Sequence, residues 1–172
     1  MVERLRGKLG GERIPTVVGD MADVPVKGTF RLVYLVFNSL FCLLTAERQA
    51  ECFRNVARVL DVDGALVIEC YVPDPSQFDH GQRVDALDVT EDSATIGVYR
   101  HDAEAQRFNS QKITFSAAGI QLQPLAQRYS WPDELDEMAE HAGLRLGERH
   151  GDWDRRPFDS VSVNHISVYR PR

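Results

Sequence analysis

The sequence predicts an α/β fold in which an open, partial parallel sheet carries an inserted antiparallel β-meander. Residues 30–38 and 65–72 are almost wholly apolar and flank one amphipathic helix, which is typical of buried parallel strands joined by a crossover. Residues 83–129 instead contain short strand-like segments separated by turn residues, which indicates antiparallel strands. We expect a single domain over residues 1–172, with the meander inserted at 83–129.

The first residues predict a helix followed by a strand. Val2, Leu5 and Leu9 share one helical face, and an apolar strand is expected at residues 14–18. No Ser, Thr, Asp or Asn precedes the first helical turn as a cap. Because an α/β domain seldom begins halfway through a helix-to-strand unit, we expect the chain to be the second part of a nucleotide-binding fold whose first part is absent.

The central unit has clear helix and turn signals. Thr45 is placed to cap a helix over residues 46–60, and the Asp-Val-Asp-Gly segment at 61–64 predicts a turn. Strand–helix–strand connections of this kind are almost always right-handed crossovers between strands of one sheet. We therefore expect residues 30–38 and 65–72 to form neighbouring parallel strands.

The remaining elements follow in order. The meander strands are expected at residues 84–90, 95–101, 107–116 and 120–129. Ser130 offers an N-cap for a helix that begins near Pro132, and Gly143 is placed to end it. Two terminal strands are expected at residues 144–148 and 163–169.

Composition excludes several classes of function. The net charge of −6 argues against a nucleic-acid partner, because neutralising phosphates needs a basic face. The longest apolar run is too short to span a bilayer, and no secretory signal opens the chain. Three cysteines without CxxC spacing suggest reduced thiols in a cytoplasmic protein, and the five histidines lack the spacing of a metal site.

The order of these parts resembles the class I S-adenosylmethionine-dependent methyltransferases over essentially the whole chain. Its last third is similar to the branch that acts on small metabolites, which includes aminosugar N-methyltransferases. The resemblance implies a Rossmann-like sheet, S-adenosylmethionine as cofactor and methyl transfer to a small-molecule acceptor. The resembling segments are residues 17–21, 32–39, 63–69, 128–132, 142–144 and 165–169.

The sequence departs from this family where the cofactor is held. The family's glycine-rich loop follows the first strand and lets the backbone approach the methionine part of the cofactor. The sequence contains no GxG, and Gly10-Gly11 precedes a strand instead of following one. The acidic residue for the ribose hydroxyls, two strands and one helix of the sheet are also missing. We therefore expect weak or absent cofactor binding by this chain alone.

Four residues are candidates for the cofactor side of the site. By resemblance, Asp20 and Met21 match the position that holds adenine, although an Asp-initiated turn after a strand would explain them equally well. Asn38 and Ser39 lie at the carboxyl end of the central strand, where open α/β sheets bind ligands. The alternative is that these two residues are simply a polar end to that strand.

Three residues are candidates for the acceptor side. Glu69 could orient an amine or hydroxyl, or be a partly solvated glutamate at a strand end. Tyr71 is a candidate wall of the acceptor pocket, and His165 is either a base or a hydrogen-bonded core histidine. We assign no catalytic residue, because a sulfonium donor is already activated and alignment supplies most of the rate.

Three functions stay open at this point. The chain could belong to a small-molecule methyltransferase, could be a non-catalytic partner subunit or metabolite-binding protein derived from one, or could be a cofactor-independent cyclase or isomerase. The strand at residues 30–38 would have to pair with residues 17–19, recruit another subunit or expose an apolar edge. We therefore expect a homodimer or hetero-complex, with the meander as a contact surface.

Overall fold

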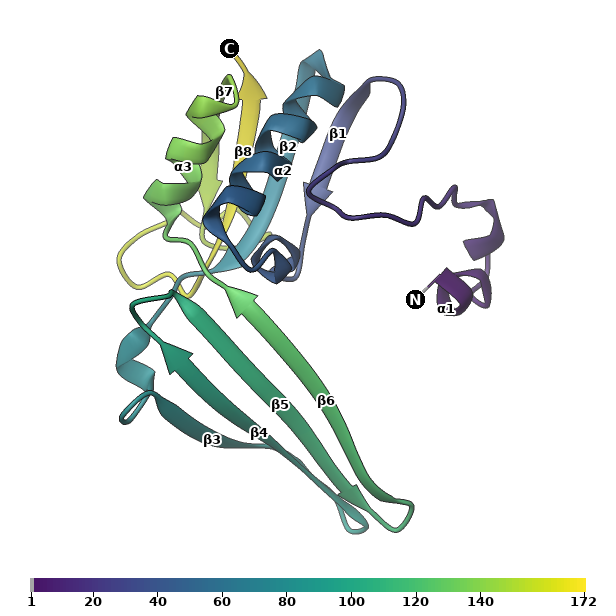
Figure 1. Cartoon of the computed structure of the whole chain (residues 1–172), viewed down its shortest axis with the longest axis vertical. Helices are drawn as coiled ribbons and strands as arrows, with labels where there is room; N and C mark the ends of the chain where they lie inside the picture. Colours follow the sequence, from purple (N-terminus) through teal and green to yellow (C-terminus); the bar gives the residue numbers. More distant parts are fainter. Residues whose placement is uncertain (1) are drawn as a thin grey trace.

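The computed structural model describes residues 2–172, which fold into two four-stranded sheets and three α-helices (Figure 1). The first sheet has the strand order β1-β2-β8-β7 and the second has the order β3-β4-β5-β6. The predicted α/β class with an inserted antiparallel meander is confirmed. Met1, where the predicted domain begins, lies outside the described residues.

Each element has defined bounds. The first sheet comprises β1 (Phe30–Leu35), β2 (Leu60–Tyr71), β7 (Leu144–His150) and β8 (Asn164–Pro171). The second comprises β3 (Gln82–Val89), β4 (Ser93–Asp102), β5 (Arg107–Ser116) and β6 (Gly119–Arg128). The α-helices are α1 (Val2–Arg6), α2 (Ala46–Val59) and α3 (Pro132–His141). Three 3-10 turns are η1 (Gly11–Arg13), η2 (Ser39–Cys42) and η3 (Pro75–Gln77).

The crossover unit forms as the sequence predicts. β1 and β2 are parallel neighbours, with Val33 opposite Leu66. Thr45 caps α2, because its Oγ1 accepts a hydrogen bond from the Arg48 backbone N–H at 3.2 Å. The expected turn at residues 61–64 is instead an irregularity within β2, which begins earlier than predicted.

The core lies between the first sheet and the helices α2 and α3, which cover one face of it (Figure 1). Phe53 from α2 and Leu135 from α3 are fully buried there, together with Ile68 of β2 and Tyr169 of β8. The rings of Phe53 and Tyr169 meet edge to face, with centroids 5.7 Å apart. Hydrophobic burial in this layer holds the parallel unit together.

The predictions for the first thirty residues are wrong in part. Helix α1 ends at Arg6 and buries no side chain, and Leu9 is fully exposed. Residues 14–18 form no strand, and Val18 is 88% exposed. A strand needs a neighbour to satisfy its backbone groups, and no other strand within residues 2–172 adjoins this segment. Apolar alternation alone therefore did not produce a strand.

The prediction that residues 30–38 form a buried strand is also wrong. β1 ends at Leu35, and the side chains of Leu32 and Tyr34 are 56% and 63% exposed. The physical reason is that Leu32 and Tyr34 alternate with Val33 and Leu35, which pack against the core, and so lie on the face that α2 and α3 do not cover. β1 is also an edge strand, which pairs with β2 alone among the described strands. Pairing with residues 17–19 does not occur, so this chain exposes an apolar edge.

A buried polar cluster joins the meander to the helices. The Arg128 guanidinium at the end of β6 donates to the Gln49 side-chain oxygen at 2.9 Å and to the Ser130 hydroxyl at 2.6 Å. Ser130 is thereby engaged with Gln49 and does not cap α3 as expected. Trp131 takes the N-cap position, and its backbone N–H donates to the Glu134 carboxylate at 2.7 Å. Gly143 ends α3 with a φ of 78°, as predicted.

Replacing Gln49 with Met should lower the free energy of unfolding by about 2 kcal/mol, because a largely buried guanidinium then loses a hydrogen-bond partner. Urea denaturation measures this change. The same substitution at Gln123, which is exposed on β6, is the matched control and should change stability little. Equal losses in the two variants would contradict this role of the cluster.

Candidate functional site

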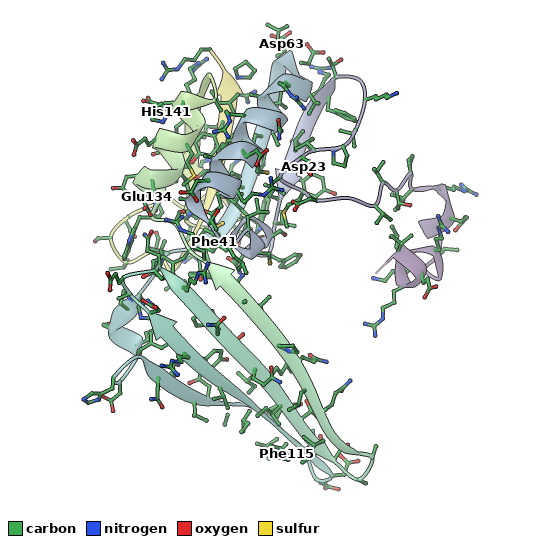
Figure 2. The ribbon with its side chains drawn as sticks, in the orientation of Figure 1. Asp23, Phe41, Asp63, Phe115, Glu134 and His141 are labelled. Atoms are coloured by element: carbon green, nitrogen blue, oxygen red, sulfur yellow. The ribbon has the colours of Figure 1, made fainter. Side chains whose placement is uncertain are left out.

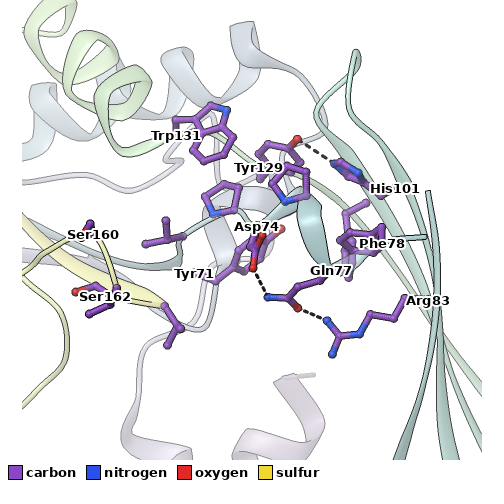
Figure 3. A pocket seen from close by; sticks show the side chains of 16 residues that line it. Tyr71, Asp74, Gln77, Phe78, Arg83, His101, Tyr129, Trp131, Ser160 and Ser162 are labelled. Atoms are coloured by element: carbon purple, nitrogen blue, oxygen red, sulfur yellow. Dashed lines mark hydrogen bonds between the residues drawn. The ribbon is translucent and has the colours of Figure 1, made fainter. Parts of the chain in front are cut away.

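A pocket of about 730 Å³ opens where β2 ends, between that strand, the meander and the loop before β8 (Figure 3). The meander contributes the face that carries Arg83, His101 and Phe108, which we call the inner face. Open α/β sheets bind ligands at the carboxyl ends of their strands, so the pocket lies where such a fold places a site. Its remaining lining residues are Tyr71, Val72, Pro73, Asp74, Pro75, Gln77, Phe78, Tyr129, Trp131, Ser160, Val161, Ser162 and Val163.

Aromatic rings form one wall of the pocket (Figure 3). Phe78 stacks on His101 with centroids 4.8 Å apart, and His101 stacks on Tyr129 at 5.6 Å. The His101 Nε2 and the Tyr129 hydroxyl are 3.0 Å apart and share a hydrogen bond. Burial raises the pKa of Tyr129, so its phenol stays neutral at physiological pH. The stacking and the hydrogen bond therefore fix the positions of these rings, and the wall offers a ligand a mostly apolar surface with a neutral tyrosine.

A polar edge faces this wall. The Asp74 carboxylate accepts from the Ser76 hydroxyl at 2.5 Å and from the Gln77 amide at 2.9 Å, which lowers the pKa of Asp74. Gln77 in turn accepts from Arg83. Arg83 is already paired with Asp85 at 2.6 Å, and both Asp74 oxygens already accept hydrogen bonds, so Asp74 would present its negative charge to a ligand through its remaining lone pairs.

The two acceptor-side candidates on β2 take different places. Tyr71 lines the pocket, and burial raises the pKa of its phenol. Its hydroxyl is buried and has no hydrogen-bond partner among the described residues. Glu69 does not line the pocket. Its carboxylate accepts from the Phe37 backbone N–H and from the Trp153 indole, each at 3.0 Å, and so ties two loops to β2.

Asn38 and Ser39 brace the loop after β1. Asn38 has a left-handed φ of 58°, and its side-chain oxygen accepts from the Tyr71 backbone N–H at 2.7 Å. Its carbonyl accepts from the Gln127 amide at 3.3 Å, while the Ser39 hydroxyl donates to the Val36 carbonyl. The polar atoms that the sequence suggests as ligands are thus engaged within the chain.

Asp20 forms the turn that was the alternative to a ligand role. One carboxylate oxygen accepts from the Ala22 backbone N–H at 2.9 Å, and the other pairs with Arg48 at 2.9 Å. These two contacts lower the pKa of Asp20, the Ala22 hydrogen bond most. Met21 packs against the hydrophobic core.

His165 lies in the core of the first sheet and does not line the pocket. Its Nδ1 is 2.9 Å from the Ser167 hydroxyl, and its Nε2 has no partner within residues 2–172. Burial, followed by the nearby Arg149 charge, lowers the pKa of His165 from 6.5 to about 4. This arrangement matches the core histidine that was the alternative to a catalytic base.

Most residues that line the pocket are not among the candidates that the sequence suggests. Phe78, His101, Phe108 and Tyr129 come from the meander and the segment that leads into it, and none was a candidate. The only sequence signal for these residues is that aromatic side chains and a histidine recur along the predicted strands, a pattern that is equally typical of a sheet packed without a ligand site. The pocket exists because two separate sheets meet.

The described residues contain neither a cluster suited to a metal ion nor a helix suited to a bilayer. In residues 2–172, no three His, Cys, Asp or Glu side chains gather closely enough to hold a metal ion. The helices of this part of the chain are all too short or too polar to cross a bilayer. Cys52 and Cys70 are buried thiols and Cys42 is exposed.

Comparison with solved structures decides the family. The CcbJ methyltransferase from Streptomyces caelestis is 34% identical, with a TM-score of 0.90 over 98% of this chain and 68% of its own length. This chain belongs to the S-adenosylmethionine-dependent methyltransferases. No known family profile matches the sequence, and no curated protein is significantly similar to it.

Two more distant structures share the fold. An S-adenosylmethionine-dependent methyltransferase from Clostridium acetobutylicum is 9% identical, with a TM-score of 0.79 over 90% of this chain. CalS10, an amino pentose methyltransferase from Micromonospora echinaspora, is 22% identical, with a TM-score of 0.63 over 88% of this chain. This chain spans 63% of the length of each.

The residues present do not form a site that fits the cofactor of this family. Both carboxylate oxygens of Asp20 and the side-chain oxygen of Asn38 already accept hydrogen bonds within the chain, and the Ser39 hydroxyl donates to the Val36 carbonyl. The sequence has no GxG turn, so it offers no glycine-rich loop through which the backbone could approach a ligand closely. The adjoining edge of β1 is exposed instead of walled.

The buried His165 predicts a pH dependence of stability. Between pH 6.5 and about 4 the unfolded chain binds a proton at this residue that the folded chain does not. The free energy of unfolding should therefore fall in this range as the pH is lowered, by up to about 1.4 kcal/mol per pH unit from His165. Urea denaturation at several pH values measures the slope. A His165→Gln variant should show a shallower slope, and an unchanged slope would contradict the assignment.

Proposed function

We propose that this methyltransferase acts on a small-molecule acceptor that binds in the pocket between β2 and the meander. The observation that supports this most directly is the pocket itself. Its volume of about 730 Å³ lies within the range typical of small-molecule sites, and an aromatic wall with a few polar groups is typical of them as well. CalS10 is an amino pentose methyltransferase and KedS8 is a sugar N-methyltransferase, which favours an acceptor of similar size.

The lining residues would bind and align the acceptor. Tyr129 and His101 hold each other in place, so the wall loses little conformational entropy when a ligand binds. Tyr71 would form another part of the wall, and the ionised Asp74 would attract a hydroxyl or amino hydrogen of the acceptor. Glu69 would contribute indirectly, by holding the Phe37 and Trp153 loops, and His165 would support β8 from the core.

The cofactor side would involve Asp20, Met21, Asn38 and Ser39, in keeping with the family resemblance. In the described structure these residues brace turns, and they leave one side of any bound cofactor uncovered. Residues 1–172 alone would therefore bind S-adenosylmethionine weakly or not at all. With three cysteines that form no disulfide, the protein would work in the cytoplasm, as a homodimer or within a hetero-complex.

Isothermal titration of the chain with S-adenosylmethionine should show no binding tighter than about 1 mM. CalS10, whose structure was solved with S-adenosylmethionine bound, is the positive control. Micromolar binding by residues 1–172 would contradict the expectation and would mean that these turns rearrange into a cofactor site.

Trp131 lines the pocket and can report its occupancy, once Trp153 is changed to Phe so that Trp131 is the only tryptophan. Titration with a panel of amino sugars should give a saturable change in Trp131 fluorescence for at least one compound. A Val161→Phe change at the pocket rim should weaken that compound at least about tenfold, about 1.4 kcal/mol. Undiminished binding in this variant would place the compound outside the pocket.

Acceptor binding without any cofactor binding in the assembled protein would favour a non-catalytic, metabolite-binding role.

A further inference from the structure

The outer face of the meander, opposite the pocket, is an exposed apolar surface. Strand pairing places Val84 opposite Val98, Ile96 opposite Ile113, Ile113 opposite Leu122, and Phe115 opposite Ile120. These residues alternate with the inner-face residues along each strand, so they share one face. Ile120 and Leu122 are 68% and 57% exposed. An apolar face of this extent on a soluble protein marks an interaction site.

The two ends of this face differ in shape. Near the first sheet it forms a shallow hollow of about 510 Å³, and the outer-face residues Val98, Arg100 and Pro124 line it. The far end carries Phe115 and Ile120 beside the hairpin turns (Figure 2). Apolar side chains at one end could therefore fill a hollow at the other end of a second copy.

The two ends also differ in charge. Arg100 is exposed in the hollow and forms no ion pair within residues 2–172. Glu91 and Asp92, at the far turn between β3 and β4, likewise form none in this part of the chain. Ile96 lies midway between Asp92 and Arg100 in the chain, four residues from each. A two-fold axis through the Ile96–Ile113 row would set Arg100 of one copy over the acidic turn of the other.

We infer that the outer face of the meander binds the same face of a second copy of this chain, in an antiparallel two-fold dimer. A two-fold contact uses one patch twice, so a patch whose two ends complement each other in shape and charge suits it. The inference rests on the proposed function in one respect, that the protein works as an assembly. It names the partner and the surface.

The size of the face is sufficient for such a contact. Four strands about 4.8 Å apart and about ten residues long, at about 3.4 Å per residue, give each face a footprint of roughly 650 Å². A standard stable interface buries about 800 Å² of accessible surface per partner, and the accessible area of a face with side chains exceeds its flat footprint. The pocket opens on the inner face and stays accessible in this dimer.

Light scattering coupled to size-exclusion chromatography tests the inference on the full chain. The wild type should have a mass of about 39 kDa, twice the 19.4 kDa of one chain. Leu122→Arg, on the outer face, should give the monomer mass at concentrations where the wild type is dimeric. Gln123→Arg, at the next residue of the same strand and on the inner face, is the matched control and should stay dimeric.

Charge exchange tests the predicted orientation. Arg100→Glu alone and the paired change Glu91→Lys with Asp92→Lys should each raise the dimer dissociation constant at least about tenfold. Combining all three changes should restore the dimer, because the two ends then attract again with reversed signs. A lack of restoration would overturn the antiparallel arrangement.

Other outcomes separate this inference from the proposed function. A monomeric wild type, or a dimer that Leu122→Arg leaves intact and Leu32→Lys at the edge of β1 breaks, would overturn the inference. Trp131 fluorescence titration of the Leu122→Arg variant should show unchanged acceptor binding, because the pocket lies on the opposite face. Loss of the dimer and failure of the acceptor site are therefore observed independently.

Discussion

The guanidinium of Arg128 anchors the meander to the rest of the molecule. Arg128 is the last residue of β6, and its guanidinium lies largely buried between α2 and α3. Gln49 and Ser130 accept hydrogen bonds from the guanidinium, and the Glu134 carboxylate lies 3.6 Å from it. A buried charge is tolerated only when its donors are satisfied, so this contact specifies one position for the end of β6. The pocket depends on that position, because Tyr129 and Trp131 follow Arg128 directly.

Polar side chains at the ends of β1 and β2 have a bracing role. A sheet whose strands end in loops leaves backbone N–H and C=O groups without ladder partners, and these groups must be satisfied. Asn38 and Glu69 do so for the loops around them, and Gln127 joins the same network from β6. Residue types that suit ligand binding therefore also suit the closing of a strand end, and their position alone does not separate the two roles.

Two apolar surfaces of this chain are exposed to solvent. One is the edge of β1, where Leu32 and Tyr34 are exposed, and the other is the outer face of the meander. Both combine unburied apolar area with strand geometry, and the first also has unpaired backbone groups. The pocket opens on neither surface, so contacts there and ligand binding can occur together.

The sequence by itself determined the local elements and their order. The crossover from β1 through α2 to β2, the four-stranded meander and the αL glycine at Gly143 are all encoded by periodicity, capping and turn chemistry, which act over a few residues. Only the tertiary structure decided that residues 14–18 have no strand partner and that β1 is an exposed edge. It also decided that the Ser130 hydroxyl accepts a hydrogen bond from Arg128 and does not cap α3. The pocket belongs to the second group as well. His101 and Tyr129 lie beside Tyr71 because two sheets meet, and contacts between residues far apart in the chain leave no periodic trace in the sequence.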